Sequence, residues 1–134
     1  MVDDKDKQIL NILKKNARST NTEIAKAVRL TEGSVRNRIA KLVSNGTIRR
    51  FTIETSVAAR YGIVMVKAKD DTKRMMRNIT KLGLSKDAYE ISGEYDACII
   101  VEGESIEDID EKIDQIRKLK SVDDTRTFIS LRRW

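Results

Sequence analysis

Apolar residues in the first fifty positions recur at the spacing of helices. The pattern holds over three short segments, 3–16, 21–28 and 32–44. In the third segment, Val35 and Ile39 fall on one face. Three short helices with a tight turn between the second and third have the arrangement of a helix-turn-helix. We therefore expect a winged-type helix-turn-helix domain over residues 1–50.

Cap residues mark the ends of these segments. Thr20 and Thr31 precede the second and third segments, where a hydroxyl oxygen accepts a hydrogen bond from a free helix amide. Glu23 lies three residues after Thr20, which is the capping-box pattern. The pair Asn45-Gly46 follows the third segment, and it predicts a left-handed stop there.

From residue 62 onward the pattern changes to alternating strands and helices. Apolar runs predict strands, and amphipathic stretches behind a cap residue predict helices. The predicted elements are a strand over 63–68, a helix from a Thr72 cap to 82, strands over 88–92 and 97–102, a helix from a Ser105 cap to 119, and a strand over 122–131. This βαββαβ order is ferredoxin-like, so the fold class is α+β with the sheet domain over 62–134.

A β-prone segment joins the two halves. Residues 48–55 alternate in polarity and include Phe51 and Ile53, which is typical of a strand or an extended linker. We expect residues 51–61 to connect the domains, with a hinge over 56–61.

The excess of positive charge is confined to the N-terminal part of the chain. The net charge is +6, but residues 1–50 hold twelve Lys/Arg and five Asp/Glu, whereas residues 51–134 hold 15 and 16. Such an asymmetry favours a polyanion as partner of the first domain alone.

The third predicted helix carries polar and cationic residues opposite its apolar face, as a DNA recognition helix does. Arginine can pair with guanine and asparagine with adenine, whereas a helix N-terminus can hold a phosphate. The alternative is the exposed face of an ordinary surface helix. The residues that we expect to contact DNA are Asn21, Thr22, Thr31, Ser34, Arg36, Asn37, Arg38 and Lys41.

Several classes of function are disfavoured. The chain has no histidine, the commonest general base, and its single Cys98 sits in an apolar run. The acidic run over 107–114 has the spacing of a solvated helix face and not of a metal cluster. We therefore expect no enzyme activity, no metal and no cofactor. Because the sequence shows no signal peptide or membrane span, we expect a cytoplasmic protein.

The sequence resembles the Lrp/AsnC family of transcriptional regulators. In the first half, the run Asn21-Thr22-Glu23-Ile24-Ala25 and the later Gly46-Thr47-Ile48 are similar to family motifs. In the second half, Gly93-Glu94-Tyr95-Asp96 and the run from Val122 to Thr127 are similar to family segments. The turn before the third helix departs from the family pattern, because it lacks the proline that members often carry there.

The resemblance implies properties that the residue pattern alone does not. Members form homodimers that assemble into higher oligomers such as octamers. The strand after the DNA-binding domain pairs protomers, the sheets pack face to face, and an effector, commonly an amino acid, binds where dimers meet. The effector-binding residues implied by position are Gly93, Tyr95, Asp96, Thr125 and Thr127. These same residues also suit an ordinary hairpin turn and an ordinary strand.

The main hypothesis is a sequence-specific DNA-binding regulator whose assembly or DNA binding responds to a small effector. The alternative is an architectural protein that packs DNA without sequence preference and carries a ligand-sensing domain. RNA binding by the sheet is disfavoured, because it needs stacking aromatic residues and the strands over 63–68 and 97–102 have none.

Overall fold

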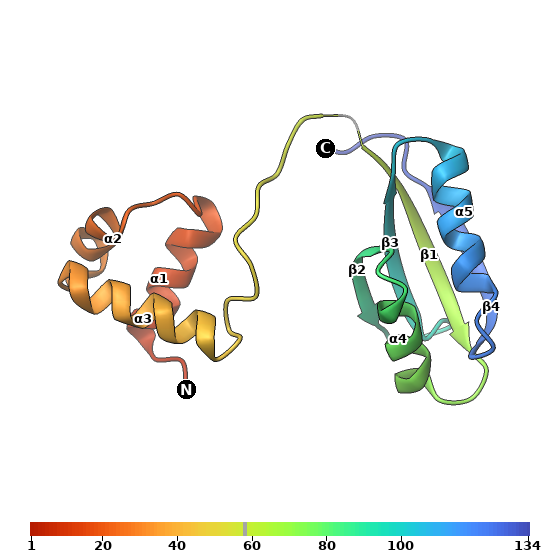
Figure 1. Ribbon diagram of the computed structural model, residues 1–134, viewed down its shortest axis with the longest axis horizontal. Coiled ribbons are helices and arrows are strands. Elements are labelled where there is room, and N and C mark those ends of the chain that lie inside the picture. Colours follow the sequence, from red (N-terminus) through yellow and green to blue (C-terminus); the bar gives the residue numbers. More distant parts are fainter. Residues whose placement is uncertain (58) are drawn as a thin grey trace. The chain divides into compact units, whose positions relative to one another are not determined.

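The computed structural model describes residues 1–57 and 59–134. The chain forms two compact units, Met1–Ser56 and Val57–Trp134 (Figure 1). Each unit has its own cluster of buried apolar side chains, so each is described by itself.

The first unit consists of three helices, α1 (Asp4–Lys15), α2 (Asn21–Val28) and α3 (Glu32–Ser44). All three lie where the apolar periodicity predicts them. Their inward residues form one core, in which Ile9, Ile24 and Val35 are fully buried. Because each helix is short, packing of this shared apolar face supplies most of its stability.

The predicted caps are present, with one difference. The hydroxyls of Thr20 and Thr31 accept hydrogen bonds from the third amide of the helix that follows, at 3.1 and 3.2 Å. The chain leaves α3 through Gly46, whose φ of +80° is the left-handed stop that was expected. The reciprocal capping box, predicted at Thr20, is recorded at α1 instead, where Asp3 and Asp6 each accept from the other's backbone amide.

The segment 48–55 does not form a strand. Residues 49–56 belong to no helix or strand, and the side chains of Phe51 and Ile53 are exposed. Of the two structures predicted for this segment, the strand is not observed. A lone strand gains nothing from its β-prone sequence until another strand offers it hydrogen bonds.

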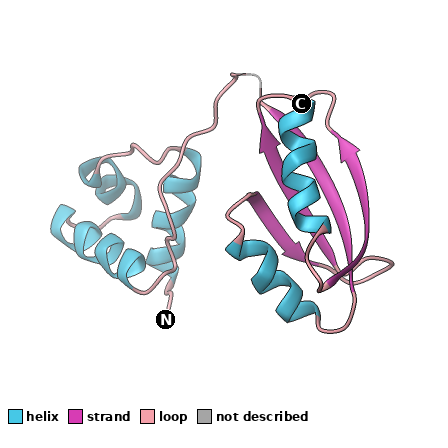
Figure 2. Cartoon of the chain, turned by 45° about the vertical axis from the view of Figure 1, so that its right-hand side comes forward, coloured by secondary structure: helices cyan, strands magenta, loops and turns pink. Residues whose placement is uncertain are grey.

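The second unit is a four-stranded antiparallel sheet in the order β2-β3-β1-β4, formed by β1 (Arg60–Ala68), β2 (Ser85–Glu90), β3 (Ala97–Gly103) and β4 (Val122–Ile129). The helices α4 (Thr72–Lys81) and α5 (Ile106–Arg117) cover one face (Figure 2). The predicted βαββαβ fold is confirmed. Several boundaries differ from the prediction. β1 begins at Arg60, inside the predicted hinge over 56–61, of which residue 58 lies outside the described residues. β2 covers Ser85–Glu90, β3 ends at Gly103, β4 ends at Ile129, α4 and α5 end at Lys81 and Arg117, and Asp71 is the cap of α4 instead of Thr72.

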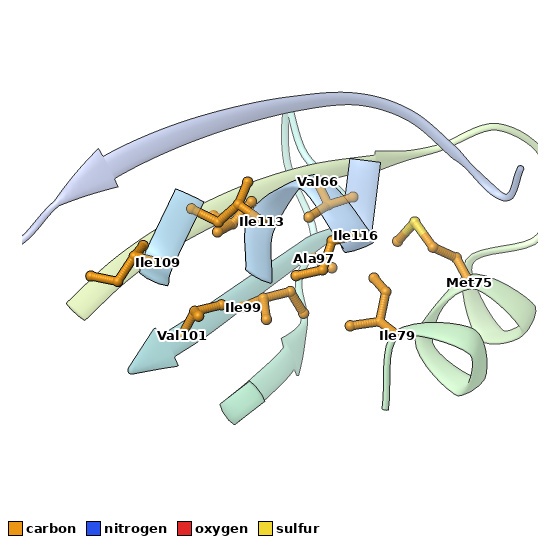
Figure 3. Packing of buried hydrophobic residues seen from close by; sticks show 10 residues of the cluster. Val66, Met75, Ile79, Ala97, Ile99, Val101, Ile109, Ile113 and Ile116 are labelled. Atoms are coloured by element: carbon orange, nitrogen blue, oxygen red, sulfur yellow. The ribbon is translucent and has the colours of Figure 1, made fainter. Parts of the chain in front are cut away.

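Alternate residues of the central strands make the core of this unit. Val66 of β1 and Ile99 of β3 point toward the helices, where they meet Ile113 of α5 and Ile79 of α4 (Figure 3). All four side chains are buried. The strand period of two therefore separates a helix-covered face from an opposite face that neither α4 nor α5 covers.

We call that opposite side of the sheet the open face. The side chains that form it are half-buried or exposed, and most of its centre is apolar. Strand pairing places Ile63 between Ile100 and Phe128, and Met65 between Cys98 and Arg126. A sheet with one packed face and one apolar face left uncovered is suited to bury that second face against a partner.

Candidate functional site

The outward face of α3 presents polar side chains beside a buried stripe. Arg36, Asn37 and Lys41 are exposed, whereas Val35 and Leu42 of the same helix are buried. Among the residues that the structure describes, no hydrogen bond holds the side chain of Asn37 or Lys41. These two groups are free to meet an external partner.

Arg36 has one ion pair, and that pair is weak. Its guanidinium lies 3.0 Å from the carboxylate of Glu32, one helical turn away, and its side chain is 63% exposed. An exposed pair of this kind contributes about 0.3–0.5 kcal/mol, so a phosphate or a guanine edge can replace Glu32 at little cost.

Residues at the starts of α2 and α3 complete the polar surface. Thr22 is exposed in the first turn of α2 and Asn21 is half-buried there. Thr31 is the N-cap of α3, and the backbone amide of the half-buried Ser34 donates to its hydroxyl. Both helix starts therefore leave backbone amides that can donate to a phosphate oxygen.

Arg38 differs from the other predicted DNA contacts. Its guanidinium nitrogen Nη1 lies 2.7 Å from Asp3 and 2.9 Å from Asp6, and its side chain is only 30% exposed. The structure thus gives Arg38 two partners at the start of α1, the N-cap Asp3 and Asp6, that the sequence pattern did not indicate. No local signal could have revealed them, because they lie 35 and 32 residues away in the chain.

The predicted effector residues fall into two groups. Gly93, Tyr95 and Asp96 lie between β2 and β3, whereas Thr125 and Thr127 lie on β4. β1 separates β3 from β4 in the sheet. With neighbouring strands about 4.8 Å apart, the two groups lie roughly 10 Å from each other where they approach most closely.

Asp96 ties its loop to β1. One carboxylate oxygen accepts a hydrogen bond from the amide of Ala68 at 2.8 Å. The backbone amide of Asp96 donates to the carbonyl of Val66, and its carbonyl accepts from Ile91. A carboxylate accepts several hydrogen bonds, so its second oxygen retains capacity for an ammonium group. Nearby, the ammonium of Lys67 lies 5.4 Å from the centroid of the Tyr95 ring.

The two threonines share an arginine that sequence reasoning missed. Arg117 of α5 donates to the hydroxyl of Thr125 at 3.2 Å and to that of Thr127 at 3.4 Å. It also lies 3.0 Å from Asp114 and 3.7 Å from Asp110. The sequence carried no signal for this contact, because it depends on how α5 lies across the edge of the sheet.

Other kinds of site receive no support in the part of the chain that the structure describes. Residues 1–57 and 59–134 hold no group of three or more histidine, cysteine, aspartate or glutamate side chains that could bind a metal ion. Within the same residues, no helix is long and apolar enough to cross a membrane.

Comparisons with known proteins cover both units. A family model described as winged helix-turn-helix DNA-binding matches residues 2–49. A second, described as the Lrp/AsnC ligand binding domain, matches residues 62–134. The HTH-type transcriptional regulator LysM of Saccharolobus solfataricus is 40% identical over 136 residues, which span 99% of this chain and 96% of that protein.

Solved structures agree with the fold. AsnC of E. coli matches with a TM-score of 0.70 at 25% identity, over 99% of this chain and 94% of that chain. A regulator from Neisseria meningitidis, solved as a complex with L-Met, matches with a TM-score of 0.74 at 18% identity, over 98% of this chain and 91% of that chain. Both family models and the curated relative belong to regulators and not to enzymes, which agrees with the expectation drawn from the sequence. The chain belongs to the Lrp/AsnC family of transcriptional regulators, with a helix-turn-helix DNA-binding unit followed by the family's ligand-binding domain.

Proposed function

We propose that this regulator recognises specific duplex DNA sequences through the outward face of α3, and that an amino acid modulates its DNA binding or assembly. The observation that carries the first part is the exposed set Arg36, Asn37 and Lys41 opposite the buried Val35. Arginine and asparagine on one helix face can make bidentate contacts to guanine and adenine, whereas lysine suits a phosphate. We propose that it acts in the cytoplasm.

The remaining contacts position the helix. We propose that the starts of α2 and α3 hold the DNA backbone, since their free amides and hydroxyls can donate to phosphate oxygens. The positioning residues proposed there are Asn21, Thr22, Thr31 and Ser34.

Footprinting on the promoter of its own gene tests this proposal. Protection that is periodic and confined to roughly palindromic sites would support sequence-specific recognition by a dimer. Uniform coating of the fragment would contradict it and support the architectural alternative. Asn37→Ala should relax preference at one base position by about 1–3 kcal/mol, whereas the matched control Asn11→Ala, on the exposed face of α1, should leave it unchanged.

We propose Gly93, Tyr95, Asp96, Thr125 and Thr127 as the effector-binding residues. An amino acid needs a carboxylate for its ammonium group, which Asp96 can supply. It also needs hydrogen-bond donors for its own carboxylate, which the threonine hydroxyls and turn amides can supply. The L-Met bound to the Neisseria regulator supports this class of effector by likeness of fold.

A thermal-shift screen of the twenty amino acids tests the effector. A true ligand at one hundred times its Kd should stabilise the chain by about 2.7 kcal/mol. Asp96→Asn should abolish the shift while it retains an acceptor for the amide of Ala68, and the neighbouring Glu94→Gln should preserve it. If none of the twenty shifts the transition at saturating concentration, the amino-acid effector is wrong.

We propose a homodimer that buries the open face and assembles further, into an oligomer such as an octamer. The uncovered apolar side chains Ile63, Met65 and Ile100 support this assembly, as do the exposed Phe51 and Ile53 of the linker. Light scattering of the purified chain measures its mass. The mass of a single 15.3 kDa chain would overturn the proposal.

A further inference from the structure

One arginine of α3 is held by α1 while its neighbours face outward. Arg36 is 63% exposed, whereas Arg38, two residues later, is 30% exposed and directed at the first turn of α1. Its Nη1 donates to Asp3 at 2.7 Å and to Asp6 at 2.9 Å. These are short, charge-assisted hydrogen bonds, the stronger kind in proteins.

The two carboxylates are themselves fixed. The Oδ1 atom of Asp3 accepts from the amide of Asp6 at 2.8 Å, and the Oδ2 atom of Asp6 accepts from the amide of Asp3 at 3.1 Å. The remaining oxygen of each carboxylate receives Arg38. All four oxygens therefore have partners, and the side chain of Asp6 is only 11% exposed. The capping box therefore holds both carboxylates where they accept hydrogen bonds from the guanidinium.

The same turn of α1 also reaches α2. The ammonium of Lys5 donates to the carbonyl of Val28, the last residue of α2, at 2.6 Å. This carbonyl belongs to the helix end, where the last carbonyls lack partners within the helix. The N-cap and first turn of α1 thus contact the end of α2 through Lys5 and the middle of α3 through Asp3 and Asp6. We call these residues, together with Arg38, the α1 clasp.

We propose that Arg38 is a positioning residue and that the α1 clasp sets the orientation of α3 on which base recognition depends. This inference rests on the proposed sequence-specific binding through Arg36 and Asn37. A base contact requires a side chain to meet one edge in the groove, whereas contacts to phosphates tolerate small rotations of the helix. Loss of the clasp should therefore weaken specific binding more than nonspecific binding.

If Arg38 contacted DNA directly, neutralising one of its partners would have the opposite effect on DNA binding. Asp3 and Asp6 are anions, which a DNA backbone repels. If Arg38 contacted DNA, neutralising Asp3 would release its guanidinium and tighten binding. If Arg38 positions α3, neutralising Asp3 weakens specific binding although a negative charge has been removed. The sign of the change therefore separates the two roles.

The test compares Asp3→Asn with Asp4→Asn in the full chain. Asparagine is as good an N-cap as aspartate, so Asp3→Asn keeps the cap of α1 but turns an amide toward Arg38. Asp4→Asn makes the same change of charge one residue later, where the carboxylate is 95% exposed and only 3.8 Å from Lys7. Fluorescence anisotropy measures affinity for a footprinted site and for a scrambled fragment at several salt concentrations, at a temperature where circular dichroism shows each variant folded.

We expect Asp3→Asn to lower the ratio of specific to nonspecific affinity by about two- to fivefold, the scale of one lost ion pair, and Asp4→Asn to leave it unchanged. The dependence of affinity on salt should stay unchanged. Arg38→Gln should lower the ratio in the same way, and the double variant Asp3→Asn/Arg38→Gln should be no worse than Arg38→Gln alone.

Four results would overturn the inference. Tighter binding by Asp3→Asn, or a salt slope reduced by about 0.9 for each Arg38 removed, would show a direct phosphate contact. An unchanged ratio in a folded variant would show that the clasp only stabilises the unit. If the unaltered chain itself prefers no site, the proposed function fails first and the inference fails with it.

Discussion

Gly62 marks the place where α5 approaches the sheet most tightly. A Cβ atom added at Gly62 would lie 2.7 Å from Cγ2 of Ile109 and 3.3 Å from Cδ1 of Ile113. Both isoleucines are buried against β1 and β3, so neither can turn away into solvent. Gly62→Ala should therefore force α5 away from β1.

The magnitude follows from this geometry. The contact with Ile109 must lengthen by about 0.7 Å to reach the ordinary distance of 3.4 Å. Overpacking a close-packed core by a methyl group costs about 1–3 kcal/mol. Alanine also restricts the unfolded chain relative to glycine, which stabilises the folded state by about 0.4–1 kcal/mol. We expect a net loss of about 1–2 kcal/mol in the free energy of unfolding of the second unit.

Native-state hydrogen exchange of the β1 and β3 amides measures this loss, because it reports the second unit separately from the first. The matched control is Gly33→Ala in α3, where the added Cβ would meet only Nη2 of Arg36 at an ordinary 3.7 Å. That change should stabilise the first unit by up to about 1 kcal/mol and leave the sheet amides unaffected. Sheet protection in Gly62→Ala equal to that of the unaltered chain would refute the close-contact argument.

Three further predictions concern the caps, the acid range and the open face. Thr31→Ala should lower the thermal midpoint of the first unit, at a cost of about 0.5–2 kcal/mol, because it removes the acceptor for the amide of Ser34; Thr31→Asn should restore it. The hydrogen bond from Arg38, with that from the Asp6 amide, holds the pKa of Asp3 below its ordinary value of 3.8. The stabilisation that results is complete above the pKa that Asp3 has in the unfolded chain. It is lost as the pH falls through the lower pKa that Asp3 has in the folded state. The midpoint difference between the unaltered chain and Asp3→Asn should therefore shrink below about pH 4, and a constant difference down to pH 2 would contradict the ion pair. Met65→Lys should lower the mass measured by light scattering toward that of a single chain, and an unchanged mass would count against burial of the open face.

Local signals were enough to predict most of the elements. The hydroxyl caps Thr20 and Thr31 and the stop at Gly46 depend only on atoms a few residues away, so the sequence determined where α2 and α3 begin and where α3 ends. The change from a period of 3.6 to strands and helices likewise predicted the βαββαβ order. The outward face of α3 could also be predicted from local sequence, because Arg36 and Asn37 lie outward whenever Val35 lies inward.

Local signals in the sequence could not predict contacts between distant segments. Three contacts each join segments that lie apart in the sequence. They are the ion pairs of Arg38 with Asp3 and Asp6, the hydrogen bond from the amide of Ala68 to Asp96, and the hydrogen bonds from Arg117 to two threonines. A charged side chain can bind many complementary groups, and only the packing of helices and strands decides which of them lies within hydrogen-bond distance. Residues 48–55 have the sequence pattern of a strand but form none. Their alternation is real, but whether they form a strand depends on a hydrogen-bonding edge that the sequence pattern cannot supply. The sequence by itself thus determined the elements and the outward residues of α3. The tertiary structure decided which of those residues are free to meet DNA, because burial and ion pairing are properties of the packed unit.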